Sequence, residues 1–117
     1  MNTETTIVNT FSREEQRIRK GLKQSTRCRG LLKFNTFLDL KYDCKNCITD
    51  IEYFLKDYDT VTIRNILNAF KKLKKDISES KSRFMNKLRE EDDPLYYYID
   101  EMEDRRMVQE YLNRNGK

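Results

Sequence analysis

Three cysteines are the residues of this 117-residue chain whose spacing could support metal or redox chemistry. Cys44 and Cys47 are separated by two residues, and Cys28 precedes them. A zinc site usually needs four converging cysteine or histidine ligands, and the chain has no histidine and no fourth cysteine. Cys44 and Cys47 also fall on the apolar face of a predicted helix. We therefore predict core thiols, with no bound metal or cofactor. The alternatives are a metal site completed by a carboxylate or another chain, and a redox role.

General acid–base catalysis has few candidate groups in this sequence. Histidine, the commonest general base near neutral pH, is absent. The chain also lacks a glycine-rich phosphate loop and a nucleophile elbow. The carboxylate pairs Glu90/Glu91 and Asp92/Asp93 are adjacent in the sequence, so the members of a pair do not share a helical face. We therefore expect a protein that is not an enzyme.

Charged residues are arranged in blocks along the chain. Residues 13–33 carry eight Lys or Arg and two Glu, and residues 39–59 carry three Lys and six acids. Residues 60–89 carry nine Lys or Arg and two acids, whereas residues 90–104 carry eight acids and no base. Such blocks either pair inside the fold or present basic and acidic faces to different partners.

The basic blocks offer one of two candidate binding surfaces. Lysines and arginines bind nucleic acid phosphates without regard to sequence, and they are also common on a solvated helix face. The candidate phosphate contacts are Arg17, Lys20, Arg27, Lys71, Lys72 and Lys75.

Tyrosines and acids near the C-terminus offer the other candidate surface. The sequence Tyr96-Tyr97-Tyr98 follows an acidic run, and on a helix only Tyr98 would join the apolar stripe. Exposed tyrosines are good interface anchors, although they also lie flat over neighbouring helices. A second apolar set faces the opposite side of the same helix, unless a kink returns it to the core. The candidate protein contacts are Tyr96, Tyr97, Met107, Val108, Tyr111 and Leu112, with Glu90, Glu91, Asp92 and Asp93 for electrostatic steering.

A long helix over residues 60–89 is the element around which we expect the others to pack. Its apolar residues recur at steps of three, four and seven from Ile63 to Leu88, which places them on one side of a helix. Asp59 or Thr60 can cap its N-terminus. Between Ser78 and Ser82 the stripe is interrupted, so we expect the helix to bend or to leave its partners there.

Shorter elements are predicted around this helix. Residues 1–11 are small and polar and predict a loose, flexible tail, and Ser12 with Glu15 forms a capping box that would start a first helix. Apolar residues over 31–40 predict a second helix, and Asp43 is a candidate cap for a third. Asp93 and Pro94 predict the cap and first residue of a final helix that ends near residue 113.

The sequence therefore predicts an all-α protein, with four or five helices in a single domain over residues 12–117. Apolar runs are too short to span a membrane, and the odd cysteine count fits a reducing cytoplasm of the producing or host cell. No motif identifies a family, but a short helical chain with charge in blocks is similar to many small phage and mobile-element regulators. We expect an adaptor, inhibitor or regulator that binds a partner protein or a second copy of itself. The alternative is a basic nucleic-acid-binding transcriptional regulator.

Overall fold

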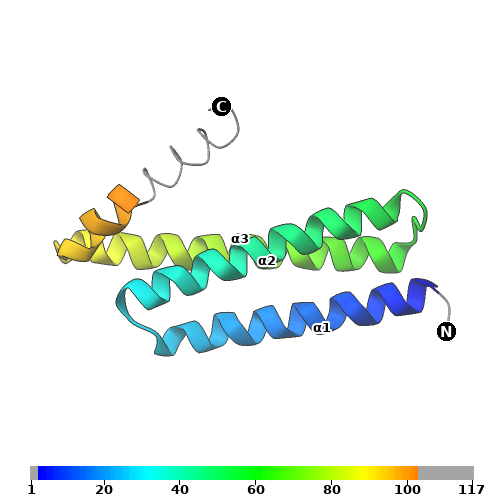
Figure 1. Ribbon diagram of the computed structural model, residues 1–117, viewed down its shortest axis with the longest axis horizontal. Helices are drawn as coiled ribbons and strands as arrows, with labels where there is room; N and C mark the ends of the chain where they lie inside the picture. The colour runs from blue at the N-terminus through cyan, green and yellow to red at the C-terminus, as the bar shows by residue number, and fades with distance from the viewer. Residues whose placement is uncertain (1–2, 103–117) are drawn as a thin grey trace, which may run out of the picture. The chain divides into compact units, whose positions relative to one another are not determined.

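The computed structural model describes residues 3–102, and within them the chain is helical and contains no strand (Figure 1). The long helices are α1 (Thr3–Gln24), α2 (Gly30–Leu55) and α3 (Val61–Glu90), and the 3-10 helix η1 (Ser25–Arg27) connects α1 to α2. The chain is helical again from residue 94 to residue 102. The all-α prediction is confirmed. No helix among the described residues combines the length and apolar content needed to cross a membrane.

Two compact units divide the chain, one from Met1 to Lys81 and the other from Ser82 to Lys117. The boundary falls inside α3, in the stretch where the sequence predicted a weak point, and the helix is continuous there. The predicted long helix over residues 60–89 matches α3 to within one residue at each end. The single domain over residues 12–117 stays a prediction.

α1 includes most of the segment that we predicted as a loose tail. Residues 3–11 are helical, and the tail prediction is wrong because Ile7 and Phe11 are buried. The Phe11 ring packs edge-to-face against Phe54 of α2 and Phe70 of α3, with centroids 6.1 and 6.3 Å away. Ser12 therefore lies inside a helix that tertiary packing extends beyond its local start signal.

α2 is one helix where the sequence suggested two. Asp43 does not cap a new helix but lies in the middle of α2. The reason is that the apolar residues of both predicted helices form one continuous stripe, at steps of three and four residues. The buried members of this stripe are Phe34, Phe37, Leu40, Cys44, Cys47 and Ile51.

Gly21 explains how closely α1 approaches α2. A Cβ atom placed on Gly21 would lie 2.8 Å from Cδ2 of Leu40, which is nearer than side chains tolerate. Glycine is unfavourable inside a helix by about 1 kcal/mol relative to alanine. Here the cost is offset by close packing, since the two helices are antiparallel neighbours (Figure 1).

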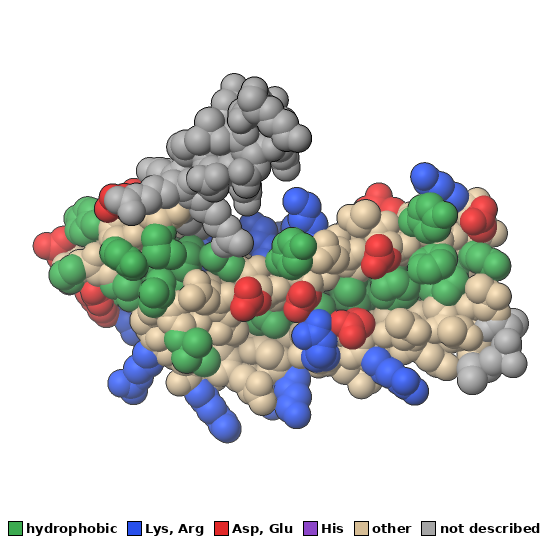
Figure 2. Space-filling view, in the orientation of Figure 1, with side chains coloured by type: hydrophobic (Ala, Val, Ile, Leu, Met, Phe, Trp, Pro, Cys, Tyr) green, Lys and Arg blue, Asp and Glu red, His purple; other side chains and the backbone are tan. Residues whose placement is uncertain are grey.

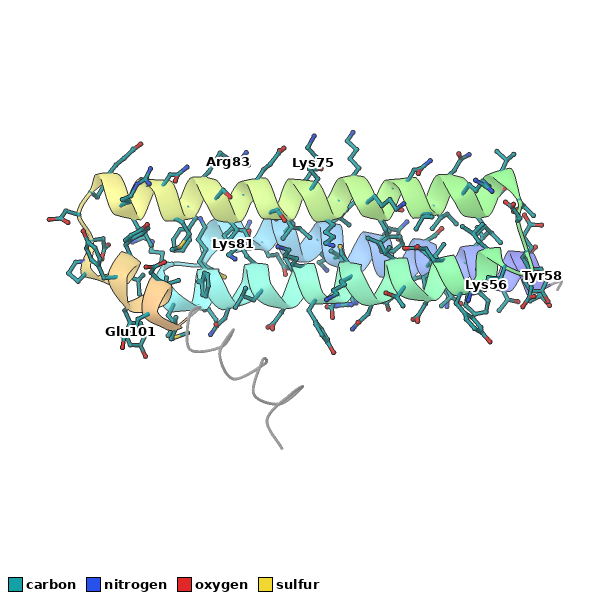
Figure 3. All side chains as sticks on the ribbon, turned by 90° about the horizontal axis from the view of Figure 1, so that it is seen from above. Lys56, Tyr58, Lys75, Lys81, Arg83 and Glu101 are labelled. Carbon is teal, nitrogen blue, oxygen red and sulfur yellow. The ribbon has the colours of Figure 1, made fainter. Side chains whose placement is uncertain are left out.

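α3 begins at a cap that the sequence predicted. The Ile63 amide donates to the Thr60 hydroxyl oxygen at 3.3 Å, and the Arg64 amide donates to the Thr60 carbonyl at 3.0 Å. Ile63, Phe70 and Ile77 on the inner side of α3 are fully buried. Near the end of the first unit, the Lys81 ammonium lies 5.4 Å from the ring centroid of Phe34 and points toward α2 (Figure 3). α3 therefore packs through an apolar stripe, and Lys81 adds a cation–π contact with Phe34 of α2.

Candidate functional site

The predicted protein-binding acids form the turn that ends α3. The Asp93 amide donates to the Leu88 carbonyl at 2.9 Å, and the Asp92 amide donates to the Arg89 carbonyl at 3.1 Å. This pair of bonds is a Schellman motif, in which the residue that follows the C-cap of the helix adopts a left-handed backbone conformation. Asp92 occupies that position with φ 52°. Glu90, Glu91 and Asp92 are exposed around the turn.

Asp93 and Pro94 start the next helical stretch as the sequence predicted. The Asp93 carboxylate accepts a 2.9 Å hydrogen bond from the Leu95 amide. Proline suits the first helical position because its missing amide would have no partner there. The cap therefore fixes the direction in which the following tyrosines leave the turn.

Tyr97 is the best defined of the predicted contact residues. Its hydroxyl donates to the Asp92 carboxylate at 3.2 Å, and its ring packs edge-to-face on Tyr96 with the centroids 5.3 Å apart. The hydrogen bond to Asp92 raises the pKa of the Tyr97 phenol, because the bond favours the neutral form. The Tyr97 side chain is nevertheless 59% exposed, so it is held in place and remains accessible.

Tyr98 differs from its prediction. We expected Tyr98 on the apolar stripe, but it is 54% exposed, whereas Ile99 is buried and Tyr96 is half-buried. The helix begins at residue 94 and sets the rotation of this stretch, which places Ile99 and not Tyr98 inward. The predicted contacts farther along the chain lie outside the described residues, and they are Met107, Val108, Tyr111 and Leu112.

The predicted phosphate contacts all lie in the first unit. Lys71, Lys72 and Lys75 are exposed on α3, and Lys20 and Arg27 are exposed on α1 and η1. Figure 3 shows Lys75 pointing away from α2. None of these five side chains has an ion-pair partner in the part of the chain that the structure describes.

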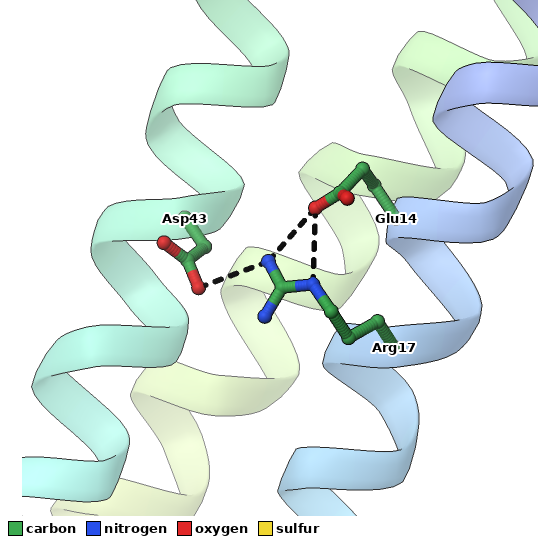
Figure 4. Close-up of polar contacts among 3 residues, drawn as sticks. All are labelled: Glu14, Arg17 and Asp43. Carbon is green, nitrogen blue, oxygen red and sulfur yellow. Dashed lines mark hydrogen bonds and ion pairs between the residues drawn. The ribbon is translucent and has the colours of Figure 1, made fainter.

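Arg17 is the exception within this set. Its guanidinium donates to Glu14 at 2.8 Å and to Asp43 of α2 at 3.2 Å (Figure 4). These hydrogen bonds, the one to Glu14 above all, raise the pKa of Arg17. Two carboxylates neutralise the charge that a phosphate would need, so Arg17 joins α1 to α2 and is the weakest phosphate contact of the set.

Cys44 and Cys47 are buried in the core of the first unit. Desolvation raises the pKa of each thiol from 9.0 to about 11. A thiol with such a pKa is almost fully protonated at neutral pH and is a poor nucleophile and metal ligand. Among the described residues, no group of three cysteines, histidines or acids is placed to hold a metal ion. Burial and a raised pKa are the properties expected of thiols that pack in a protein core.

The outward face of α2 is a surface that our sequence interpretation missed. Asp39, Tyr42, Asp50 and Tyr53 are exposed on it, and Tyr42 and Tyr53 are 64% and 62% exposed. In Figure 2, acidic and hydrophobic side chains alternate along this helix. The signal was present as Asp-Leu-Lys-Tyr at 39–42 and Asp-Ile-Glu-Tyr at 50–53, two copies 11 residues apart.

Comparison with known proteins adds no family to this description. The chain matches no protein-family model, no curated protein and no solved structure.

Proposed function

We propose that the chain is a non-enzymatic protein-interaction module, an adaptor, inhibitor or regulator that acts by binding a partner protein. The proposal is carried by Tyr97, a large exposed side chain held by Asp92 and Tyr96. An anchor that is already ordered loses little side-chain entropy on binding, and tyrosine is enriched at binding hot spots. The acidic–tyrosine segment comprises Glu90, Glu91, Asp92, Asp93, Tyr96 and Tyr97.

The charge of this segment indicates the character of the partner. Its four consecutive acids precede the tyrosines, and the exposed carboxylates of Glu90, Glu91 and Asp92 lie at the turn itself. Acidic groups around aromatic anchors favour a basic partner surface, because they speed encounter and select against acidic surfaces. We therefore propose a partner with a Lys- or Arg-rich patch around a pocket that accepts a tyrosine.

We propose that the helices form a small bundle of four to five members organised around α3. We place the protein in the cytoplasm of the producing or host cell, where buried thiols such as Cys44 and Cys47 remain reduced.

A photocrosslinking experiment in the source cell tests this function. A photoreactive phenylalanine analogue at position 98, exposed beside Tyr97, should yield a discrete crosslink to one protein, and the same analogue at Gln16, exposed on α1, should not. Excess unlabelled wild-type protein should compete for the crosslink. The Tyr97→Ala and Asp92→Gly proteins should compete poorly, because they lack the anchor or the group that holds it, and glycine tolerates the left-handed backbone at position 92. Equal crosslinking from both positions, or equal competition by all proteins, would overturn the proposal.

A second function, nucleic acid binding, is favoured by five cations on α1, η1 and α3 that have no ion-pair partner among the described residues. If Lys71, Lys72 and Lys75 contact phosphates, binding to labelled duplex DNA, single-stranded DNA or RNA should weaken steeply with salt. The Lys71/Lys72/Lys75→Glu protein should then lose binding, and a Lys20/Lys23→Glu protein should lose only part of it. Absence of binding at low salt would exclude this function.

A further inference from the structure

The outward faces of α2 and α3 carry opposite charge, and neither belongs to the acidic–tyrosine segment. On α2, Asp39 and Asp50 are 11 residues apart, which is about three helical turns and about 16 Å. Eleven residues return a helix to within about 20° of the same direction, so the two carboxylates lie in one row. Tyr42 and Tyr53 each follow three residues later and form a parallel row of exposed rings.

α3 carries the complementary row. Lys71, Lys72 and Lys75 are exposed, and Figure 3 shows Lys75 directed away from α2. Arg64 lies 11 residues before Lys75, the same separation as that of Asp39 and Asp50. Arg64 donates to Asp59 at 2.8 Å in an exposed pair. Such a pair still leaves the guanidinium able to bind a further carboxylate, as Arg17 does with Glu14 and Asp43.

The exposed aromatic rings on α2 can also form cation–π contacts with lysine side chains. Lys56 already places its ammonium 5.7 Å from the ring centroid of Tyr53. A cation over a ring face contributes about 0.5–1 kcal/mol at an exposed site, and the aliphatic stem of a lysine covers apolar surface. The Tyr42 ring, exposed between Asp39 and Asp50 in the sequence, offers a second such position.

We propose that the outward face of α2 binds the outward face of α3 of a second copy of this chain. Asp39 and Asp50 pair with Lys75, Lys71 and Arg64 of the other copy, and the tyrosines pack against the lysine stems. Because the two surfaces are different, the contact is head-to-tail. Each copy keeps one free face of each kind, so further copies add in a row. A symmetric contact between two α2 faces is disfavoured because it would bring aspartates together.

Sedimentation of the full chain at several concentrations tests this proposal. At low salt the wild-type protein should have a weight-average mass above the 14.2 kDa of one chain, rising with concentration. At about 1 M NaCl, where the Debye length is about 3 Å, the mass should fall toward 14.2 kDa. The Asp39/Asp50→Lys protein and the Lys71/Lys75→Glu protein should each sediment as monomers. An equimolar mixture of the two should associate again, because each face then meets the opposite charge.

Matched controls separate this contact from general charge effects and from the proposed partner site. Lys20/Lys23→Glu changes the net charge as Lys71/Lys75→Glu does, and Asp57/Asp100→Lys, at two exposed positions outside both faces, changes it as Asp39/Asp50→Lys does. Both controls should associate like the wild-type protein, and circular dichroism should show that all variants stay helical. A wild-type protein that is monomeric at every concentration and salt, or a mixture of the two charge-reversed proteins that stays monomeric, would overturn the proposal. Since none of the substituted positions lies in the acidic–tyrosine segment, neither result affects the proposed partner binding.

Discussion

Thr60 and Glu4 are 56 residues apart in the sequence, and a hydrogen bond between them joins the N-termini of α3 and α1. The Thr60 hydroxyl donates a 3.0 Å hydrogen bond to Glu4 Oε1, and the same oxygen accepts the bond from the Ile63 amide that caps α3. The residue that starts α3 therefore also fixes the start of α1. One short side chain uses both its donor and its acceptor capacity for this purpose.

Substitution of Thr60 should lower the free energy of unfolding. Thr60→Ala removes the cap and leaves the Glu4 carboxylate without this partner, so we expect a loss of about 1 kcal/mol in urea denaturation. Thr60→Ser keeps the hydroxyl and should retain most of the stability. Thr62→Ala, at an exposed neighbouring position, should change stability by less than about 0.5 kcal/mol. Equal effects at positions 60 and 62 would contradict the capping role.

Phe11 should be among the most costly residues to truncate. Its ring is buried between Phe54 and Phe70, and Phe→Ala changes in a core typically cost about 3–5 kcal/mol. We expect thermal unfolding of Phe11→Ala at a much lower temperature than that of the wild type. Phe11→Leu should lose less, because it fills part of the cavity. A change below about 1 kcal/mol for Phe11→Ala would show that the start of α1 is not part of the core.

Gly21→Ala should have different effects on stability in two backgrounds. In the wild type, the added methyl group meets Leu40 Cδ2 and offsets the gain of about 1 kcal/mol in helix propensity. In a Leu40→Ala background the space is open, so the same substitution should stabilise the protein. A double-mutant cycle followed by urea denaturation measures the difference. Identical effects in both backgrounds would mean that Leu40 moves away without cost.

The buried thiols should make the protein less stable at alkaline pH. In the unfolded chain a thiol ionises near pH 9.0, whereas in the fold the pKa is about 11 for Cys44 and Cys47. Between these values the unfolded state releases protons first, so stability is full below pH 9.0 and falls as the pH rises toward 11. The expected loss is about 2–3 kcal/mol per thiol.

The Cys44/Cys47→Ala protein is the control for this pH dependence. It should be less stable at neutral pH, but its stability should fall less steeply across the same pH range. The two proteins differ only at these two positions, so the difference between the two curves belongs to the thiols. Parallel curves would show that the thiols ionise equally in both states.

Elements with strong local signals could be predicted from the sequence. Thr60 gives α3 its start, and Asp93 with Pro94 starts the stretch that follows, because caps depend on residues within a few positions. Local signals were misleading where distant contacts decide. Ser12 suggested a helix start and Asp43 another, but Ile7 and Phe11 extend α1, and the continuous apolar stripe carries α2 past Asp43.

Parts of the candidate site depend on geometry that sequence alone does not provide. Tyr97 was predicted to be exposed, but its bond to Asp92 requires the left-handed backbone of Asp92. Asp39, Tyr42, Asp50 and Tyr53 were missed because their 11-residue repeat has meaning only once α2 is one helix. The neutralisation of Arg17 required the contact between α1 and α2.

The contact of Phe11 with Phe70 also has a consequence for synthesis on the ribosome. A ribosome adds about 5–20 residues per second, so roughly 3–12 seconds separate translation of these two phenylalanines. During that time α1 and α2 can pair, but the ring of Phe11 lacks its partner from α3. The nascent chain therefore presents an open apolar surface to chaperones, and it closes this surface only when the middle of α3 leaves the exit tunnel.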